Sequence, residues 1–414
     1  MKKILILGAG TAGTMMANHL AKEISPEWSI TIVDKEERHY YQPGFLFVPF
    51  DIYKPEQTIK SIADFIPNSV DLIRAKIDRI DKDANQVILQ NETVINYDIL
   101  IIATGTHIAP EEIEGMKGES WHKDIFDFYT FEGSSNLRKK LMNWEGGKLV
   151  VHIAEMPIKC PVAPLEFAFL ADSYFKNKGM RDKVDITFVT PMDGAFTKPV
   201  ATKALNHLLE QKNIRIVPNF NIERVDEEEK KIIDYGEREV AYDLLVTVPT
   251  NMGDEAMERS GFGDDLNFVP TDKHTLQSLI KDNIFVIGDA TNIPASKAGS
   301  VAHFEAEILT ENILRYMEGV PLESEFDGHS NCFIETGNGR AILIDFNYDY
   351  EPVPGTFPIP NVGPLKLLKE SRMNHMGKLA FRWIYWNMLL KGRPIPFVSP
   401  KMNKKGKQLE LAGH

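Results

Sequence analysis

Two cysteines, Cys160 and Cys332, are the side chains of this 414-residue chain with the clearest capacity for redox chemistry. Cys160 lies in a proline-rich, glycine-free turn between an expected buried strand at 149–153 and an expected helix at 164–171. A cysteine beside a helix N-terminus has a lowered thiol pKa, and the thiolate is the reactive form. Two cysteines are too few for a disulfide-rich scaffold, so they are either reactive groups or unrelated buried thiols. The position of Cys160 favours the reactive interpretation.

A glycine-rich loop near the N-terminus predicts a second kind of chemistry, the binding of a dinucleotide. An apolar strand at 3–7 runs directly into Gly8-Ala9-Gly10-Thr11-Ala12-Gly13, and a helix is expected at 14–23. The glycines allow a tight turn and a close approach to a pyrophosphate, which then faces the helix N-terminus. Asp34 follows the next expected strand, at 29–33, and suits a ribose hydroxyl. The predicted binding residues here are Gly8, Gly10, Ala12, Gly13, Asp34 and Lys35.

Further along, the chain repeats the strands that a dinucleotide-binding unit needs. Tyr97-Asp98 opens a strand that ends in Ala103-Thr104-Gly105, and Tyr242-Asp243 opens a matching strand that ends at Pro249. The strands and the helix expected between these two are at 185–190, 202–212, 213–217, 220–226 and 231–234. We interpret the repeat as two duplicated dinucleotide-type units, of which the second lacks its glycine loop.

Together these features resemble the sulfide:quinone oxidoreductases, within the disulfide-oxidoreductase-like FAD flavoproteins. The matching residues are the glycine loop, Gln42-Pro43-Gly44, Ala103-Thr104-Gly105, Cys160-Pro161, Gly288-Asp289, Lys297-Ala298-Gly299 and Cys332. The resemblance implies an α/β fold with two Rossmann-like (three-layer ββα) domains in tandem, one FAD-binding and one a degenerate NAD-binding domain, plus C-terminal membrane-interface helices. The implied boundaries are an FAD-binding domain at 1–110 and 283–325, a second Rossmann-like domain at 111–282, and a C-terminal domain at 326–414.

The resemblance also implies the residues of the active site. Its catalytic residues would be Cys160, Cys332, Glu166 and Lys297, with Glu166 handling protons and Lys297 stabilising the reduced flavin. A solvated or capping glutamate is an equal alternative for Glu166. Besides the first loop, the implied FAD-binding residues are Gln42, Pro43, Ile77, Ala103, Thr104, Gly105, Gly288, Asp289, Lys297, Ala298 and Gly299.

One departure from the family concerns a third cysteine. Many members have it after the Ala-Thr-Gly turn, but the corresponding segment here, 115–130, contains none. In some members that cysteine tethers the flavin or joins the sulfur relay. We therefore expect FAD to be held non-covalently and the relay to depend on two sulfurs. No metal site is predicted.

We hypothesise that hydrosulfide attacks a Cys160–Cys332 disulfide, or a polysulfur bridge between the two, by thiolate exchange. A persulfide then stays on Cys160, the Cys332 thiolate attacks the flavin ring, two electrons pass to FAD, and a quinone accepts them. Further sulfide lengthens the chain until polysulfide or elemental sulfur is released. Two alternatives are kept. A type II NADH dehydrogenase would need a second glycine loop, which 156–164 lacks, and a redox-sensing or electron-transfer flavoprotein would not turn over sulfide.

The C-terminus differs in charge from the rest of the chain. The net charge is −12, which argues against nucleic acid as a partner, whereas residues 361–414 contain 11 Lys and Arg against 2 Asp and Glu, a balance of +9. Two short helices are expected, at 365–373 and 376–390, and aromatic and basic residues on the second suit an interfacial anchor. A dimer interface, or a helix packed on the body, is the alternative. The quinone-binding candidates are Phe346, Lys378 and Phe381.

The expected location follows from what the sequence does not contain. It has no apolar run of about 18 residues or more that would span a bilayer, and its first residues enter a strand without a leader pattern, so we expect a protein that is not exported. Together with the resemblance, this predicts a peripheral, monotopic membrane protein on the cytoplasmic face. Its expected partners are sulfide, a membrane quinone and the membrane surface. A homo-oligomer stays open.

Overall fold

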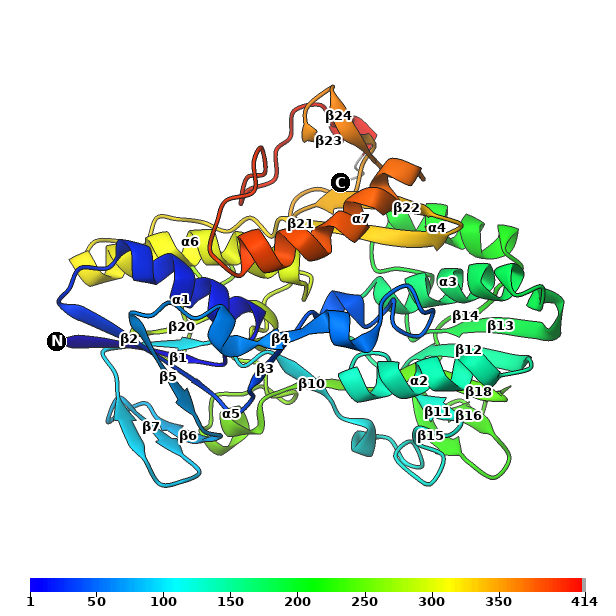
Figure 1. Cartoon of the computed structure of the whole chain (residues 1–414), viewed down its shortest axis with the longest axis horizontal. Helices are drawn as coiled ribbons and strands as arrows, with labels where there is room; N and C mark the ends of the chain where they lie inside the picture. The colour runs from blue at the N-terminus through cyan, green and yellow to red at the C-terminus, as the bar shows by residue number, and fades with distance from the viewer. Residues whose placement is uncertain (412–414) are drawn as a thin grey trace.

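A computed structural model describes residues 1–411, and its centre is two domains that are each built on a five-stranded parallel sheet (Figure 1). The strand order of the first sheet is β20-β9-β1-β2-β5, and every pairing in it is parallel. Its strands are β20 (Ile284–Val286), β9 (Ile99–Ile102), β1 (Lys2–Leu7), β2 (Trp28–Asp34) and β5 (Val70–Arg74). All of β9 is buried, as the continuous apolar runs in the sequence require for a parallel sheet covered on both faces.

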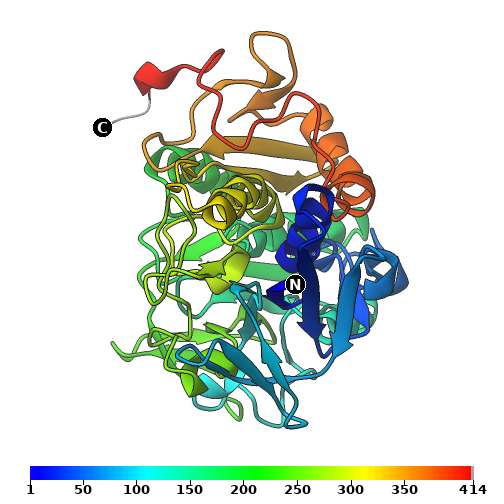
Figure 2. The same cartoon turned by 90° about the vertical axis from the view of Figure 1, so that its left-hand side faces the viewer.

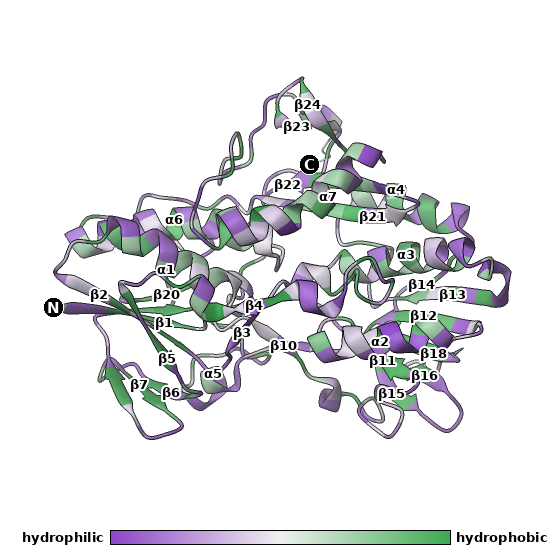
Figure 3. Cartoon of the chain, viewed as in Figure 1, coloured by the Kyte–Doolittle hydropathy of each residue, from purple (hydrophilic) through white to green (hydrophobic). Residues whose placement is uncertain are grey.

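The two faces of this first sheet are covered differently. Helices α1 (Thr11–Glu23) and α6 (Gly299–Glu318) pack together on one face. A small antiparallel layer of β6 (Ile77–Asp81), β7 (Gln86–Leu89) and β8 (Val94–Asn96) covers the other. Figure 3 shows the hydrophobic strands inside and helices that carry both hydrophobic and hydrophilic residues. This sandwich holds the carboxyl ends of the strands, where the glycine loop begins, in a fixed place.

The second domain repeats the first, as the sequence predicts. Its sheet has the order β11-β18-β12-β13-β14, again entirely parallel, with a three-stranded antiparallel layer β15-β16-β17. The strands are β11 (Ile125–Phe126), β18 (Leu244–Val248), β12 (Gly147–Ile153), β13 (Val184–Val189), β14 (Arg215–Val217), β15 (Ile222–Asp226), β16 (Lys231–Asp234) and β17 (Glu239–Ala241). The helices are α2 (Phe131–Asn143), α3 (Ala163–Asn177) and α4 (Pro199–Gln211). The α/β fold with two Rossmann-like domains is therefore confirmed.

A two-stranded ribbon joins the domains, with β10 (Thr106–Ile108) pairing antiparallel to β19 (Asn251–Gly253). Helix α5 (Glu255–Arg259) follows this ribbon and contacts β6 of the first domain. Met257, on α5, belongs to the same apolar cluster as the first sheet. The chain thus rejoins the first domain before residue 283, the boundary expected from the sequence.

The C-terminal part lies along one side of both domains, at the top of Figures 1 and 2. It is a sheet of β21 (Ser330–Gly337), β22 (Arg340–Phe346), β24 (Gly363–Leu367) and β23 (Gly355–Ile359), followed by α7 (Arg372–Ile384) and a π-helical turn at Tyr385–Leu389. Strand β21 contacts α3 and α6, so this sheet touches both domains. Within residues 1–411, no helix combines the length and apolar character needed to cross a bilayer.

The helix predicted at 365–373 is wrong. Residues 363–367 form strand β24, which pairs with β23 and continues the sheet beside β22. The helix begins only at Arg372, because Ser371 caps it with its hydroxyl, which accepts from the N–H of Asn374 at 3.0 Å. The predicted second helix is found, as α7 and the π-helical turn, which together run from 372 to 389.

The remaining short strands, β3 (Arg38–Tyr40) and β4 (Ile59–Ser61), pair antiparallel beside the first domain. They carry His39 and the polypeptide around Gln42 toward the carboxyl ends of the first sheet, where the largest set of predicted site residues gathers.

Candidate active site

A cavity of about 620 Å³ opens at the carboxyl ends of the first parallel sheet, where ligands bind in open α/β sheets. It extends to the turn that carries Cys160 in the second domain. The predicted FAD-binding residues that line it are Gly8, Gly10, Ala12, Asp34, Lys35, Gln42, Pro43, Ile77, Ala103, Thr104, Gly105, Gly288, Asp289, Lys297, Ala298 and Gly299. Gly13 is the one member of the predicted set outside that lining. The structure thus brings together residues that are far apart in the sequence.

Gly13 has a structural part in the loop. A Cβ atom on Gly13 would lie 1.8 Å from the carbonyl oxygen of Gly8, and Gly8 itself has a φ of +97°. Both positions therefore need glycine to let the strand turn tightly into α1. A Cβ on Gly10, in contrast, would have no protein atom within 4 Å. Gly10 borders the open cavity, which leaves room for a phosphate to approach the backbone.

This contrast predicts different outcomes for two alanine substitutions. Gly13→Ala forces the loop apart, which should cost at least about 2 kcal/mol of folding free energy and lose FAD. Gly10→Ala should leave the thermal stability of the FAD-free protein unchanged. Thermal unfolding of both variants without FAD, and the flavin absorbance of both as purified, check this. Wild-type stability for Gly13→Ala would contradict the assignment of the loop.

Several polar groups in the cavity fit FAD. The hydroxyls of Thr104 and Thr106 are buried and have no hydrogen-bond partner among residues 1–411, although buried polar groups are normally satisfied. Asp34 is fixed by the N–H groups of Ala9 (2.6 Å) and Glu36 (2.8 Å), and its carboxylate lines the cavity. These groups suit the hydroxyls and phosphates of a dinucleotide. Burial raises the pKa of Asp289, which also lines the cavity, against the opposing charges of Lys297 and Lys159.

Lys297 lines the cavity but also holds its own loop together. Its ammonium donates to the carbonyl oxygens of Asp289 (2.9 Å) and Thr291 (2.6 Å) and lies over the ring of Phe268. Burial lowers the pKa of Lys297, while the nearby carboxylates of Asp289 and Glu305 oppose this shift. An ammonium has three N–H donors, so one remains for a flavin atom. Its contact with the flavin stays a prediction.

Cys160 is hydrogen-bonded directly to the loop that carries Lys297. Its backbone N–H donates to the carbonyl oxygen of Lys297 at 2.7 Å, and its own carbonyl accepts from the hydroxyl of Tyr129 at 3.1 Å. Cys160 has a φ of +47°, which turns the chain sharply before α3. The thiol therefore lies in the wall of the same cavity as the predicted FAD-binding residues.

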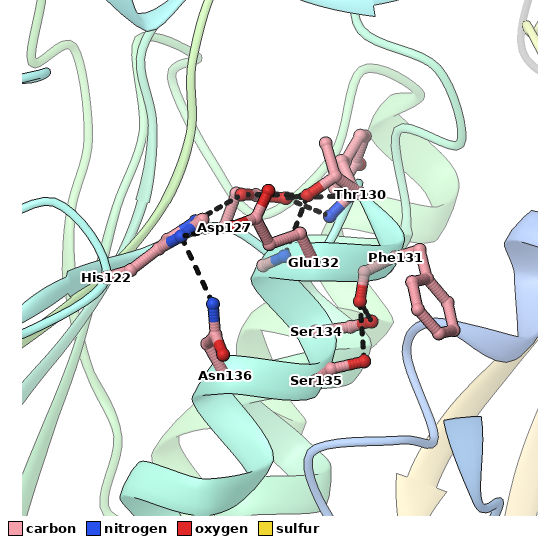
Figure 4. A network of polar contacts seen from close by, with 10 residues as sticks. His122, Asp127, Thr130, Phe131, Glu132, Ser134, Ser135 and Asn136 are labelled. Carbon is pink, nitrogen blue, oxygen red and sulfur yellow. Dashed lines mark hydrogen bonds and ion pairs between the residues drawn. The ribbon is translucent and has the colours of Figure 1, made fainter. Parts of the chain in front are cut away.

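The segment 115–130, where the family's third cysteine is absent, contains a polar network around Asp127 and Thr130 (Figure 4). The buried carboxylate of Asp127 accepts from the N–H groups of Tyr129 (2.9 Å) and Thr130 (2.7 Å), and His122 lies 3.4 Å from it. The hydroxyl of Thr130 in turn caps α2. The network thus holds the aromatic residue that supports Cys160.

Cys332 is the second sulfur and comes from the C-terminal sheet. It is on β21, paired through its backbone with Ile344 of β22, and both cysteines are free thiols. Each is partly accessible by surface area yet enclosed enough that burial raises its pKa, that of Cys160 to about 12. The charge of Cys160 further raises the pKa of Cys332, and both side chains pack against the same apolar core. Cys332, unlike Cys160, is not among the residues that line the cavity. The expected lowering of the Cys160 pKa is wrong, because desolvation outweighs the helix terminus.

Glu166 and Lys378 form a buried ion pair at the same end of the cavity, which both line. Glu166 also accepts from the N–H of Glu335 at 2.6 Å, and Lys378 donates to the carbonyl of Phe333 at 2.9 Å. Burial raises the pKa of Glu166 to about 7, although Lys378 and the N–H of Glu335 oppose the shift. The solvated alternative for Glu166 is excluded, since its side chain has no exposed surface.

The other quinone candidates lie elsewhere. Phe346 is buried in the core at the end of β22, and Phe381 is half-buried on α7; neither lines this cavity. Lys378 lines the cavity together with Glu166 and Cys160. The role of all three toward quinone stays a prediction.

Sequence reasoning missed a second group that lines the cavity. The hydroxyl of Tyr385, on the π-helical turn, lies 2.6 Å from the hydroxyl of Thr11 and 2.7 Å from Nε2 of His39. All three residues line the cavity, next to the glycine loop. No local sequence signal points to this contact, because Thr11 and Tyr385 are separated by almost the whole chain.

Comparison with known proteins gives the same picture. A family model described as pyridine nucleotide-disulphide oxidoreductase matches residues 2–306. A mitochondrial sulfide:quinone oxidoreductase from Mus musculus is 28% identical over 397 residues, covering 94% of this chain and 86% of the relative. A type II NADH:quinone oxidoreductase from Staphylococcus aureus is 26% identical over 382 residues, covering 83% and 90%.

The crystal structure of the sulfide:quinone oxidoreductase from Aquifex aeolicus has the same fold. It is 22% identical and gives a TM-score of 0.78 over 95% of this chain and 92% of its own. The predicted resemblance to sulfide:quinone oxidoreductases is thereby confirmed, and the chain belongs to the pyridine nucleotide-disulphide oxidoreductase family.

Proposed function

We propose that this oxidoreductase oxidises sulfide through Cys160, Cys332 and FAD, and that a membrane quinone accepts the electrons. The observation that carries the proposal is the hydrogen bond between the N–H of Cys160 and the carbonyl of Lys297, which joins a thiol to the predicted flavin loop. The names of relatives that match 94% of the chain support the same substrates. FAD, held non-covalently, supplies a two-electron acceptor that a quinone can reoxidise.

The two cysteines carry out the sulfur chemistry. Hydrosulfide forms a bond to Sγ of Cys160 while the bridge to Cys332 breaks, and Cys332 leaves as a thiolate. When the persulfide on Cys160 and the thiolate of Cys332 join into a bridge one sulfur longer, two electrons and one proton are released. The electrons go to the cofactor, and the proton goes to an acid–base group. Glu166 is suited to this, because burial brings its pKa to about 7 beside Lys378.

Anaerobic reduction of the flavin tests the function. Sulfide should bleach the flavin absorbance of the wild-type protein, a soluble quinone should restore it, and NADH should have no effect. The turn at 156–164 has no glycine, and Cys160 fills its centre, so it lacks the loop that a nicotinamide cofactor needs. Bleaching by NADH alone would instead support the type II NADH dehydrogenase alternative.

An exposed apolar stripe on α7 supports a peripheral membrane location, proposed to be on the cytoplasmic face. Met373, Met376, Ala380 and Trp383 are all exposed, and their spacing places them on one side of the helix. Trp383 is 63% exposed, and Val362, at the tip of the β23–β24 hairpin, is 75% exposed. Apolar and aromatic groups of this kind insert at the lipid interface. The tail contributes fewer free cations than its sequence suggests, because Lys407 is buried in an ion pair with Asp345.

Replacing the stripe should therefore release the protein from membranes. The triple variant Met373→Gln, Met376→Gln and Trp383→Gln should lower binding to anionic liposomes by at least about tenfold, since each removed apolar side chain is worth roughly 1 kcal/mol or more. Flotation with liposomes measures this. A matched control replaces Met142 and Leu279, which are also exposed but lie outside the C-terminal part. Equal flotation of the α7 variant and the control would contradict the anchor.

A further inference from the structure

A row of polar groups, Glu335 and then His375, leads outward from Glu166. The sulfur exchange described above does not involve these two residues. Glu335, on β21, is fully buried, and its N–H binds Glu166. Both carboxylate oxygens of Glu335 lie 2.9 Å from Nδ1 of His375, in the first turn of α7. The side chain of His375 is 22% exposed, so it reaches solvent. The row thus begins at the sulfur end of the cavity and ends at the surface.

Lys378 pairs directly with Glu166 and is influenced by the charge of Glu335. Burial lowers the pKa of Lys378, but Glu166 and Glu335 outweigh this and the net pKa is raised. Burial likewise raises the pKa of Glu335, against the charges of Lys378 and His375. A carboxyl group that resists ionisation at this position can receive a proton and pass it on. A purely structural ion pair would need neither a second buried carboxylate nor an exposed histidine.

We propose that Glu335 and His375 exchange the protons of the buried Glu166–Lys378 pair with solvent. This inference rests on the proposed sulfide oxidation and adds its proton exit. Each sulfur that joins the bridge releases one proton together with two electrons, and hydrogen sulfide releases one more when it enters in its neutral form. The electrons leave through the cofactor. The proposed proton path runs from the Glu166–Lys378 pair to the carboxylate of Glu335 and then to His375 and the bulk solvent. Its outer step, from Glu335 to His375, follows a direct side-chain contact, whereas Glu166 contacts Glu335 through the backbone N–H. Glu335 and His375 are positioning and relay residues, since neither touches the sulfurs.

Chemical rescue by a small buffer tests this relay. In weakly buffered solution, His375→Ala should slow sulfide-driven flavin reduction by about a hundredfold, the lower end of the range for a lost acid–base group. Added imidazole should restore the rate in proportion to its concentration, because it can occupy the vacated path. A pH-indicator dye should show proton release lagging behind flavin bleaching in the variant and coinciding with it in the wild type. Glu335→Gln should slow the reaction similarly, but imidazole should not restore it.

The controls separate this inference from the function on which it rests. His207→Ala, at an exposed histidine on α4, should behave as wild type at every imidazole concentration. Reduction of all variants by dithionite, which bypasses the sulfide site, should be unchanged. A wild-type rate for His375→Ala, or a slowed rate that imidazole does not raise, would overturn the relay while leaving sulfide oxidation intact. A wild-type protein that sulfide does not reduce would overturn the proposed function, and the relay with it.

Discussion

Replacing Cys332 with serine should abolish reduction of the flavin by sulfide, by at least about a thousandfold in rate, because the substitution removes the sulfur that forms the bridge to Cys160. The loss should not come from misfolding. Cys332 is held in β21 through backbone pairing with Ile344, and serine differs from it by one atom. FAD content should therefore match that of the wild type. Stopped-flow absorbance after anaerobic mixing with sulfide measures the rate.

Cys160→Ser should have an equally large effect, and the double variant should be no slower than either single one, since both sulfurs act as one unit. No third cysteine exists in the chain to replace either of them. Dithionite should reduce the flavin of all three variants at the wild-type rate. Retention of full sulfide activity by Cys332→Ser would show that the relay does not include it.

The two parallel-sheet domains could be predicted because their signals are local. The apolar strand before Gly8 and the spacing of the glycines predict the tight turn from a few neighbouring residues. The strand that begins with Tyr-Asp occurs in both halves of the chain. The failed helix at 365–373 shows the limit of such signals. Its leucines at 365, 367 and 368 suit a helix or a strand. The choice depends on pairing with β23 and β22, which sequence periodicity does not contain.

The sequence predicted which residues lie together better than it predicted the pKa values of their side chains. Residues of the FAD set were named from motifs, and almost all of them border one cavity. The pKa of Cys160 was predicted in the wrong direction, because a sequence shows the following helix but not the burial that opposes its effect. The partners of Glu166 could not be foreseen either. Lys378 and Glu335 reach it from α7 and β21, which tertiary packing alone brings together.

Replacing Lys378 with methionine should destabilise the folded protein, and the loss should grow as the pH rises above neutrality. In the wild type, the pKa of Glu166 is raised from 4.5 to about 7, so its ionisation already costs stability as the pH rises through that window. Without the ammonium of Lys378, the pKa of Glu166 in the folded protein rises further. The pH range over which ionisation of Glu166 lowers the stability then extends above 7. The variant should then lose about 1.4 kcal/mol more than the wild type for each pH unit above 7, up to the roughly 3–5 kcal/mol typical of a broken buried pair.

Thermal unfolding of the FAD-loaded proteins between about pH 6 and pH 9 tests this. The change of unfolding free energy with pH measures how many more protons the folded state binds than the unfolded state. The double variant Glu166→Gln, Lys378→Met removes both charges, so its difference from the wild type should stay nearly constant over this range. Lys117→Met, which breaks the exposed pair with Glu111, should change the unfolding midpoint little at any pH. If Lys378→Met and the double variant showed the same pH dependence, the carboxylate of Glu166 would not be what Lys378 stabilises. If stability falls more steeply with pH in Lys378→Met alone, the ammonium of Lys378 is what allows Glu166 to ionise inside the folded protein. Glu166 can then accept the proton that the sulfur chemistry releases.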